Sequence, residues 1–246
     1  MTVPDEAALA RWRVETGGLP AEEILGWAVA AFPGRVGFSS SLGLEDQVLA
    51  DMIAARALPV RAFTLDTGRL FPETLDLLAR TEARYGLGMR VFLPDAVEVE
   101  ALVNTHGVDL FRRSPGLRQA CCEARKVHPL KRALAGLEAW ICGLRAGQSS
   151  SRADVHAVDW DAGNGLVRIS PLAAWTGTQV DAYVRDHDVP VNPLHATGFP
   201  SIGCAPCTRA VAPGGDPRSG RWWWEAAGHR ECGLHRVAGP GEGRRG

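Results

Sequence analysis

Short apolar runs alternate with segments of helical periodicity along most of this chain. Apolar residues recur at helical spacing between residues 5 and 32, and Gly17, Gly18 and Pro20 break this stretch into two predicted helices. After Phe32 the pattern changes to short runs of the buried-strand type, separated by further helical segments. The predicted strands are residues 35–39, 60–65, 89–93 and 138–144, and the predicted helices between them include residues 45–56, 71–85 and 95–105.

Strands that alternate with helices of this length are joined by right-handed crossovers and pair in parallel. The pattern therefore predicts an α/β fold with an open, doubly wound, mostly parallel sheet, whose ligand would lie at the carboxyl ends of the strands. From about residue 212 the composition shifts to Gly, Pro and Arg. We expect residues 1–211 to form the α/β domain and residues 212–246 to form a mobile C-terminal arm.

Charge and composition narrow the function classes. The formal net charge of -1 gives no global attraction for nucleic acid or an anionic membrane, so any anion recognition must be local. The acidic N-terminal residues 1–6 are not followed by an uninterrupted apolar stretch, which argues against a signal peptide or membrane anchor. We therefore expect a cytoplasmic protein, in which clustered cysteines serve as metal ligands or catalytic thiols before structural disulfides.

Four of the six cysteines fall into two tight pairs, Cys121-Cys122 and Cys204-Ala-Pro-Cys207. Neither a disulfide nor zinc suits the adjacent pair, since a disulfide between neighbours is strained and zinc sites normally use CxxC-type spacing. Iron-sulfur ligation suits it better, because neighbouring residues can ligate different irons of one cluster. Zinc and a redox disulfide remain the alternatives. We expect both cysteines of the first pair to open a helical stretch, with Lys126 one turn beyond Cys122 on the same face.

The remaining two cysteines stand alone. Cys142 lies in an apolar run and is predicted to be a buried, inert thiol. Cys232 lies in the glycine-flanked tail, where His229, Arg230 and His235 would favour its thiolate. This environment favours a reactive nucleophile over an incidental surface thiol.

The first predicted strand runs into Ser-Ser-Ser-Leu-Gly-Leu-Glu-Asp, residues 39–46, where hydroxyls and the amides of a helix start can hold a phosphate. Neither a Walker lysine nor a GxGxxG motif accompanies it, so an ordinary capped turn is an equal alternative. A second turn, Leu-Asp-Thr-Gly-Arg-Leu-Phe-Pro at residues 65–72, follows the second strand on the same edge. Its residue types also suit a plain turn.

Taken together, these stretches resemble the assimilatory adenylyl-sulfate (APS) reductases, relatives of the phosphoadenylyl-sulfate (PAPS) reductases, from about Val36 to His235. The most specific motifs are Cys-Cys-Glu-Ala-Arg-Lys from residue 121, Gly-Cys-Ala-Pro-Cys-Thr from 203, Gly-Arg-Trp-Trp-Trp-Glu from 220 and Glu-Cys-Gly-Leu-His from 231. The resemblance implies a fold of the adenine-nucleotide-hydrolase-like (PP-loop) type.

The resemblance also implies roles for individual residues. The paired cysteines Cys121, Cys122, Cys204 and Cys207 would hold a 4Fe-4S cluster, and Cys232 would be the catalytic nucleophile. The nucleotide pocket would be lined by Ser39, Ser40, Ser41, Asp46, Leu65 and Gly143, and the phosphosulfate would be surrounded by Lys126, Arg152, Arg218, Arg221 and His235.

The implied activity is thioredoxin-dependent reduction of APS to sulfite and AMP through an S-sulfocysteine. The cysteine pairs favour APS, because the PAPS-specific relatives lack both of them. PAPS reduction is the first alternative, and an ATP-dependent tRNA-thiolating enzyme is the second, although no basic RNA surface is visible in the sequence. A zinc-bound interaction module that docks through Trp222-Trp223-Trp224 is the third; we expect those tryptophans instead to pack the base of the arm against the domain. The sequence leaves the oligomeric state open, and a homo-oligomer is compatible with it.

Overall fold

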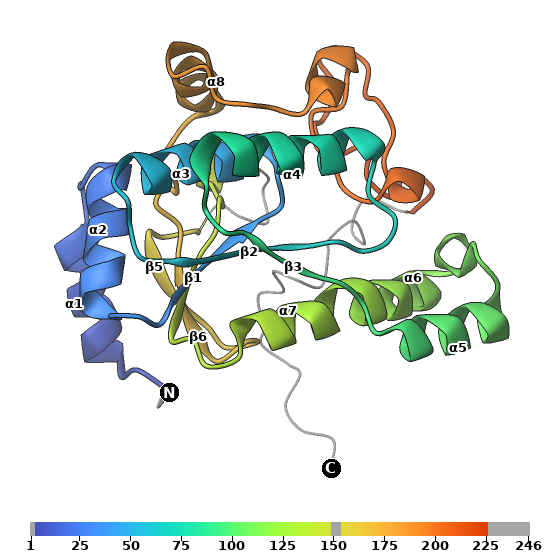
Figure 1. The fold of residues 1–246 in the computed structure, drawn as a ribbon, viewed down its shortest axis with the longest axis horizontal. Helices are drawn as coiled ribbons and strands as arrows, with labels where there is room; N and C mark the ends of the chain where they lie inside the picture. Colours follow the sequence, from blue (N-terminus) through green and yellow to red (C-terminus); the bar gives the residue numbers. More distant parts are fainter. Residues whose placement is uncertain (1–2, 149–153, 226–246) are drawn as a thin grey trace.

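The computed structural model describes residues 3–148 and 154–225 of the chain (Figure 1). Within these residues, one sheet has six strands in the order β3-β2-β1-β4-β6-β5. The pairs from β3 through to β6 are parallel, and β5 pairs antiparallel with β6 at one edge. The strands are β1 (Val36–Ser40), β2 (Arg61–Leu65), β3 (Arg90–Phe92), β4 (Ala139–Ile141), β5 (Val158–Asp161) and β6 (Leu166–Ile169).

Helices lie on both sides of this sheet, as a doubly wound fold requires. In Figure 1, α3 and α4 lie on one side and α6 and α7 on the other, while α8 packs against α3. Local signals explain several helix ends: α4 begins at Pro72, where the missing amide costs nothing, and stops at Gly86, whose φ of 59° suits glycine. The helices are α1 (Glu6–Thr16), α2 (Ala21–Ala31), α3 (Leu44–Ala55), α4 (Pro72–Tyr85), α5 (Ala96–His106), α6 (Pro115–Cys122), α7 (His128–Leu134) and α8 (Gly177–Asp186).

The described residues also contain several shorter helical turns. The turn η2 (Glu123–Val127) has π-helical geometry and joins α6 to α7. The others are 3₁₀ turns: η1 (Leu110–Arg112), η3 (Ala146–Gln148), η5 (Pro193–Thr197) and η6 (Ala205–Cys207).

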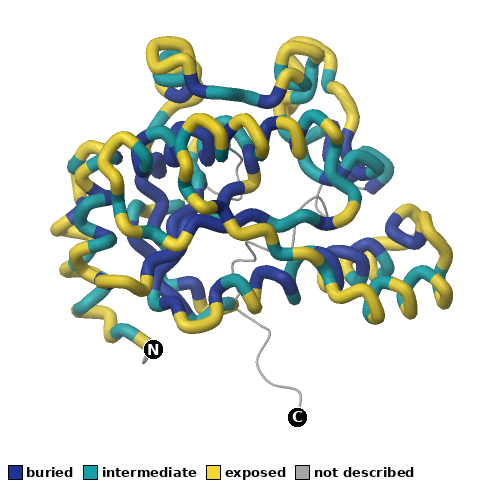
Figure 2. Tube along the Cα trace, viewed as in Figure 1, coloured by how far each residue is buried: buried dark blue, intermediate teal, exposed yellow. Residues whose placement is uncertain are grey.

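The sheet carries a hydrophobic core on each side, and Figure 2 shows the buried residues concentrated along its strands. On the α3 side, Phe38, Leu49 and Ile53 are fully buried. On the α7 side, Leu130 and Trp140 belong to a second cluster. Because both faces are covered, nearly every residue of β1 and β4 is buried, rather than every second residue.

The structure confirms the predicted fold class and the four predicted strands, with ends that differ by no more than three residues. Two strands, β5 and β6, were not predicted from the sequence. The expectation that Cys121 and Cys122 open a helix was wrong: they form the last turn of α6, directly before the π-helical turn η2. No helix in residues 3–148 and 154–225 has the length and apolar character that crossing a bilayer requires.

Candidate active site

The serine-rich loop between β1 and α3 is held in place by Asp46. The Ser41 amide and hydroxyl both donate to Asp46 Oδ2, each at 2.6 Å, and the Leu42 amide donates to Ser40 Oγ at 3.1 Å. Leu42 has a φ of 61°, a left-handed conformation that costs energy for a branched residue and is typical of functional loops. Gly43 is the N-cap residue of α3 and has no side chain. The first backbone amides of this helix therefore face the loop without a hydrogen bond from the N-cap residue.

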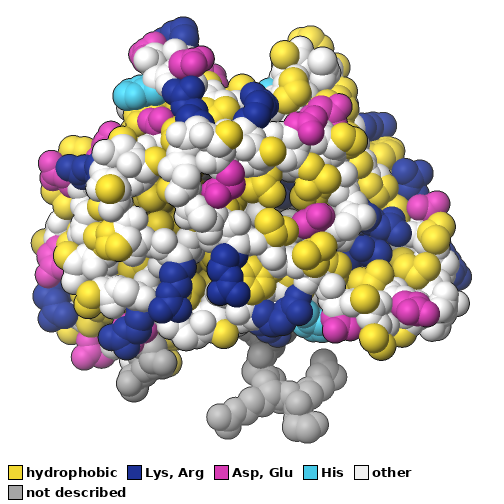
Figure 3. Space-filling model, in the orientation of Figure 1, with side chains coloured by type: hydrophobic (Ala, Val, Ile, Leu, Met, Phe, Trp, Pro, Cys, Tyr) yellow, Lys and Arg dark blue, Asp and Glu magenta, His cyan; other side chains and the backbone are white. Residues whose placement is uncertain are grey.

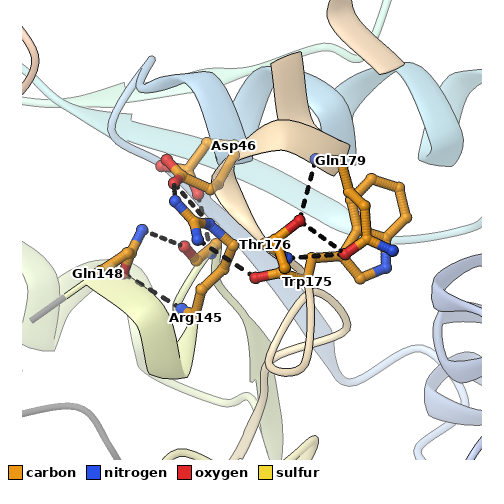
Figure 4. A network of polar contacts seen from close by, with 8 residues as sticks. Asp46, Arg145, Gln148, Trp175, Thr176 and Gln179 are labelled. Atoms are coloured by element: carbon orange, nitrogen blue, oxygen red, sulfur yellow. Dashed lines mark hydrogen bonds and ion pairs between the residues drawn. The ribbon is translucent and has the colours of Figure 1, made fainter. Parts of the chain in front are cut away.

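A second loop, after β4, touches the first one closely (Figure 4). The Gly143 amide donates to Asp46 Oδ1 at 2.9 Å, and a Cβ atom on Gly143 would lie 2.5 Å from that same oxygen. Only glycine allows this approach without displacing α3. Arg145 reinforces the contact through a 2.7 Å ion pair with Glu45.

Burial raises the pKa of Asp46 to about 6, although hydrogen bonds from Ser41 and Gly143 pull it down. The hydrogen bonds that Asp46 accepts from described residues come from the two loops. Asp46 therefore shapes the carboxyl edge of β1 and β4 by joining these two loops.

The turn after β2 leads from this edge to the paired cysteines. Its Arg69 amide donates to Thr67 Oγ1 at 3.2 Å, so the Thr67 hydroxyl proton is free to point at Cys204 Sγ, 3.3 Å away. Arg125 donates to the Thr67 carbonyl at 2.7 Å, and the Ala205 amide donates to the Arg69 carbonyl at 2.8 Å. The turn that the sequence left ambiguous thus packs directly on the cysteines.

All four paired cysteines line one pocket, although Cys121 and Cys122 end α6 and the other two lie more than 80 residues later, at residues 204 and 207. Each is less than a tenth exposed, and no two described cysteines are joined by a disulfide. The π-helical turn η2 changes the helical register directly after the first pair, as is frequent at functional sites. The remaining lining residues are four cations and two aromatic side chains: Arg69, Arg118, Arg125, Lys126, Phe111 and Trp222.

Burial raises the pKa of two of these thiols. It raises the pKa of Cys207 to about 12, where Cys204 adds to the rise and Lys126 opposes it. Burial also raises the pKa of Cys121, against the positive charge of Arg125. A soft metal centre would displace these protons, because thiolate is the ligating form. Within residues 3–148 and 154–225, no three His, Cys, Asp or Glu side chains are arranged so that they could hold a single metal ion.

The C-terminal part of the described chain closes the pocket. Trp222 is 1% exposed with a φ of 43°, and its amide donates to the Cys207 carbonyl at 3.1 Å. Arg221 donates to the Ile202 carbonyl at 3.2 Å, and a Cβ atom on Gly203 would collide with its guanidinium group. Residues 220–225 therefore pack on the α/β domain, as expected for the base of the arm.

The structure brings the candidate site residues into two groups. Ser39, Ser40, Ser41, Asp46 and Gly143 gather at the carboxyl edge of β1 and β4, with Leu65 at the end of β2. Lys126 joins the four cysteines, Arg221 lies beside Cys207, and Arg218 precedes it on the same segment. Three predicted residues lie outside the described part of the chain: Arg152, Cys232 and His235.

Sequence reasoning missed several residues of the cysteine pocket. Thr67 and Arg69 lie in a turn that was treated as a weak nucleotide motif, and Arg118 and Arg125 are arginines in a chain rich in them. Two sequence signals could have pointed to the arginines: Arg125 is adjacent to Lys126, and Arg118 lies one helical turn before Cys122. Cys142 agrees with its prediction: it is 4% exposed, and burial raises its pKa to about 11.

Two comparisons of sequence identify the class of protein. The phosphoadenosine phosphosulfate reductase domain matches residues 35–210, and the chain belongs to this family. A protein of Allochromatium vinosum named adenosine 5'-phosphosulfate reductase is 54% identical over 199 residues, which cover 81% of this chain and 78% of that protein. A protein of Agrobacterium fabrum with the same name is 49% identical over 211 residues, covering 86% of this chain and 81% of that one.

Solved structures agree with the fold. The phosphoadenylyl-sulfate reductase of Candida auris, in a phosphate complex, superposes with a TM-score of 0.73 at 29% identity, over 85% of this chain and 98% of that one. The FMN adenylyltransferase of Candida glabrata, in complex with FAD and pyrophosphate, matches with a TM-score of 0.55 at 15% identity, over 91% of this chain and 76% of that one. The second match concerns the fold alone.

Proposed function

We propose that this chain reduces adenosine 5'-phosphosulfate to sulfite and AMP in sulfate assimilation. One observation carries the proposal: two separate cysteine pairs and four cations line a single pocket, in a chain about half identical to proteins named for this reaction. The loops around Asp46 and Gly143 lie at the strand edge where such folds hold nucleotides.

In the first step, the Cys232 thiolate attacks the terminal sulfur of the phosphosulfate. A sulfur-sulfur bond forms, the bond from that sulfur to the bridging oxygen breaks, and its electron pair leaves on the phosphate oxygen of AMP. The enzyme is left with an S-sulfocysteine, and no outside electrons are consumed.

Cations stabilise the charge that collects on the leaving phosphate and the sulfonate. Lys126 and Arg221 are the described candidates, since Lys126 lines the cysteine pocket and Arg221 lies beside Cys207. Arg152, Arg218 and His235 are proposed to complete this environment.

In the second step, a dithiol such as thioredoxin supplies two electrons. One of its thiolates attacks Cys232 Sγ, sulfite leaves with the electron pair of the sulfur-sulfur bond, and a mixed disulfide forms. The second thiol of the reductant then displaces Cys232 as a thiolate and leaves the reductant oxidised.

The donor set of the pocket fits a 4Fe-4S cluster held by Cys121, Cys122, Cys204 and Cys207. Four buried thiols beside Arg69, Arg118, Arg125 and Lys126 match a cluster with net negative charge. A cluster would also distribute its thiolates over four irons, so that the adjacent Cys121 and Cys122 could ligate different irons. When bound, the cluster would supply a fixed anionic, polarisable wall that holds α6 and η6 together.

A competition assay tests the substrate. Purified protein, thioredoxin and a reductant are supplied with equal concentrations of APS and PAPS, and the nucleotide products are separated. We expect AMP to be formed in large excess over adenosine 3',5'-bisphosphate. Excess bisphosphate would make this a PAPS reductase, the activity named for the Candida auris neighbour.

The face drawn in Figure 3 carries both acidic and basic side chains, and neither kind covers it, so this face gives no support to a tRNA substrate.

A further inference from the structure

A buried ion pair joins the segment that leads to Cys232 to the helix that ends in Cys122. Arg118 lies in α6 and Glu225 is the last residue of the described chain before Cys232. The Arg118 Nε atom donates to Glu225 Oε1 at 2.7 Å, and the two side chains are 2% and 3% exposed. Such a pair recovers little net stability after desolvation, so its use lies in fixing one arrangement of the groups that it joins.

The Arg118 guanidinium contacts more than Glu225. Its Cζ atom lies 4.7 Å from the centre of the Trp222 ring, and the group also interacts with the Cys122 sulfur. Burial lowers the pKa of Arg118, but the hydrogen bond and charge of Glu225 outweigh it, and the cation is retained. One side chain thus touches the cysteine pocket and two residues of the C-terminal segment.

Backbone contacts hold the same segment from the other side. The Trp222 amide donates to the Cys207 carbonyl at 3.1 Å, and the Glu225 amide donates to the Trp222 carbonyl at 2.9 Å. Residues 222–225 therefore contact both α6, which carries the first cysteine pair, and Cys207 of the second pair. Without the Arg118 contact, this turn would keep its Cys207 side and the ring contacts of Trp223 and Trp224 with Arg112 and Phe111, but it would lose its link to α6.

Cys232 follows Glu225 by seven residues. A chain of that length spans at most about 25 Å, so the place where Glu225 is fixed limits where the thiol can reach. Fixing the origin of a short tether raises the effective concentration and improves the orientation of the group at its end.

We propose that Arg118 and Glu225 are positioning residues that set the origin of the Cys232 tether against the cysteine pocket. The proposal rests on the proposed function, since it concerns the thiol that attacks the phosphosulfate. Neither residue touches substrate in this account; both act through the placement of residues 222–225.

The test uses three variants of the full-length protein, prepared anaerobically. Glu225→Gln keeps the shape of the side chain and removes its charge, and Arg118→Lys keeps the charge and loses the planar fork. Asp159→Asn is the control, because it removes a partly buried carboxylate that pairs with Arg13 and with Arg168 on β6, away from the cysteine pocket.

Three quantities are measured: iron and sulfide content, the single-turnover rate of S-sulfocysteine formation from saturating APS without reductant, and hydrogen exchange of the peptide containing residues 218–225. In Glu225→Gln and Arg118→Lys we expect iron content within about a fifth of the parent, an adduct rate about tenfold lower, and faster exchange in that peptide. The Asp159→Asn control should match the parent in all three.

Two results would overturn the proposal. An adduct rate within twofold of the control, with exchange faster, would mean that the pair anchors the segment without positioning the thiol. Loss of iron in proportion to the loss of rate would mean that the pair supports the metal site instead. If the parent itself forms no adduct, the proposed function fails. Hydrogen exchange then tests the anchoring role separately: unchanged exchange in the variants rejects that role, and faster exchange supports it.

Discussion

Replacing Gly143 with alanine adds one methyl group, which should destabilise the contact between the loop after β4 and α3 and weaken nucleotide binding at the carboxyl edge of β1 and β4. Its Cβ atom would lie 2.5 Å from Asp46 Oδ1, 2.7 Å from Glu45 Cβ and 3.1 Å from the Asp46 amide nitrogen. The loop and the first turn of α3 must then separate by roughly 0.5–1 Å to reach ordinary van der Waals contact. The 2.9 Å hydrogen bond from the Gly143 amide to Asp46 is broken or stretched by this movement.

The magnitude follows from two costs. Overpacking a closely packed contact costs about 1–3 kcal/mol, and weakening a buried hydrogen bond to a carboxyl group costs about 1–3 kcal/mol. Because both arise from one displacement, they do not add fully, and we expect a loss of about 3 kcal/mol in the free energy of unfolding. If about half of this cost must be met again when AMP binds, because binding needs the undeformed loop, AMP affinity falls about tenfold.

Urea unfolding and calorimetric titration with AMP measure the two effects. Gly147→Ala is the control, since its Cβ atom would lie 3.6 Å from Arg145 Nη1, an ordinary contact in the same loop. It should change the unfolding free energy by less than about 0.5 kcal/mol and leave AMP binding unaltered. The reasoning is refuted if Gly143→Ala binds AMP within twofold of the parent, or loses no more stability than Gly147→Ala.

Three further outcomes follow from the site. Asp46 has a pKa raised from 3.8 to about 6, so the folded state binds its proton more tightly than the unfolded chain. The parent should therefore lose about 2 kcal/mol of stability relative to Asp46→Asn as the pH rises from 4 to 7; a difference that does not vary with pH in urea unfolding contradicts this. Lys126→Ala should reduce sulfite release much more than iron content, and equal losses would assign the lysine to holding the metal site. Thr67→Val removes the hydroxyl 3.3 Å from Cys204 Sγ, and should lower the reduction potential of a bound cluster by roughly 40 mV, the equivalent of about 1 kcal/mol; an unchanged potential in redox titration would show that the hydroxyl does not donate to the sulfur.

Much of the fold was predictable because local signals agreed with the tertiary arrangement. The strand containing Phe38 and the helix after it show buried apolar residues at the expected periods, and Pro72 and Gly86 mark the ends of α4. The strand β5 was harder, because Val-Asp-Trp-Asp is short and half polar. Its two aspartates are buried through contacts that the sequence does not reveal, including Arg168 on the neighbouring strand.

The four cysteines of the pocket were predictable from the sequence, but the residues around them were not. The two pairs are conspicuous by spacing, whereas the register shift at η2 depends on tertiary packing that periodicity cannot show. The role of Arg118 was hidden for a compositional reason: all but two of the 27 basic residues are arginine, so one more carries little information. Its burial against Glu225, 107 residues later, is a property of the folded chain.

Native mass spectrometry of anaerobically purified protein, incubated with APS and no reductant, tests the central claim most directly, because one spectrum reports both the bound cluster and the covalent adduct. The account predicts that the parent carries four irons, four sulfides and one added SO₃ group, and that Cys232→Ser carries the same cluster without the SO₃ group. Retention of the SO₃ group by Cys232→Ser, or a parent that carries zinc in place of iron and sulfide, would contradict it.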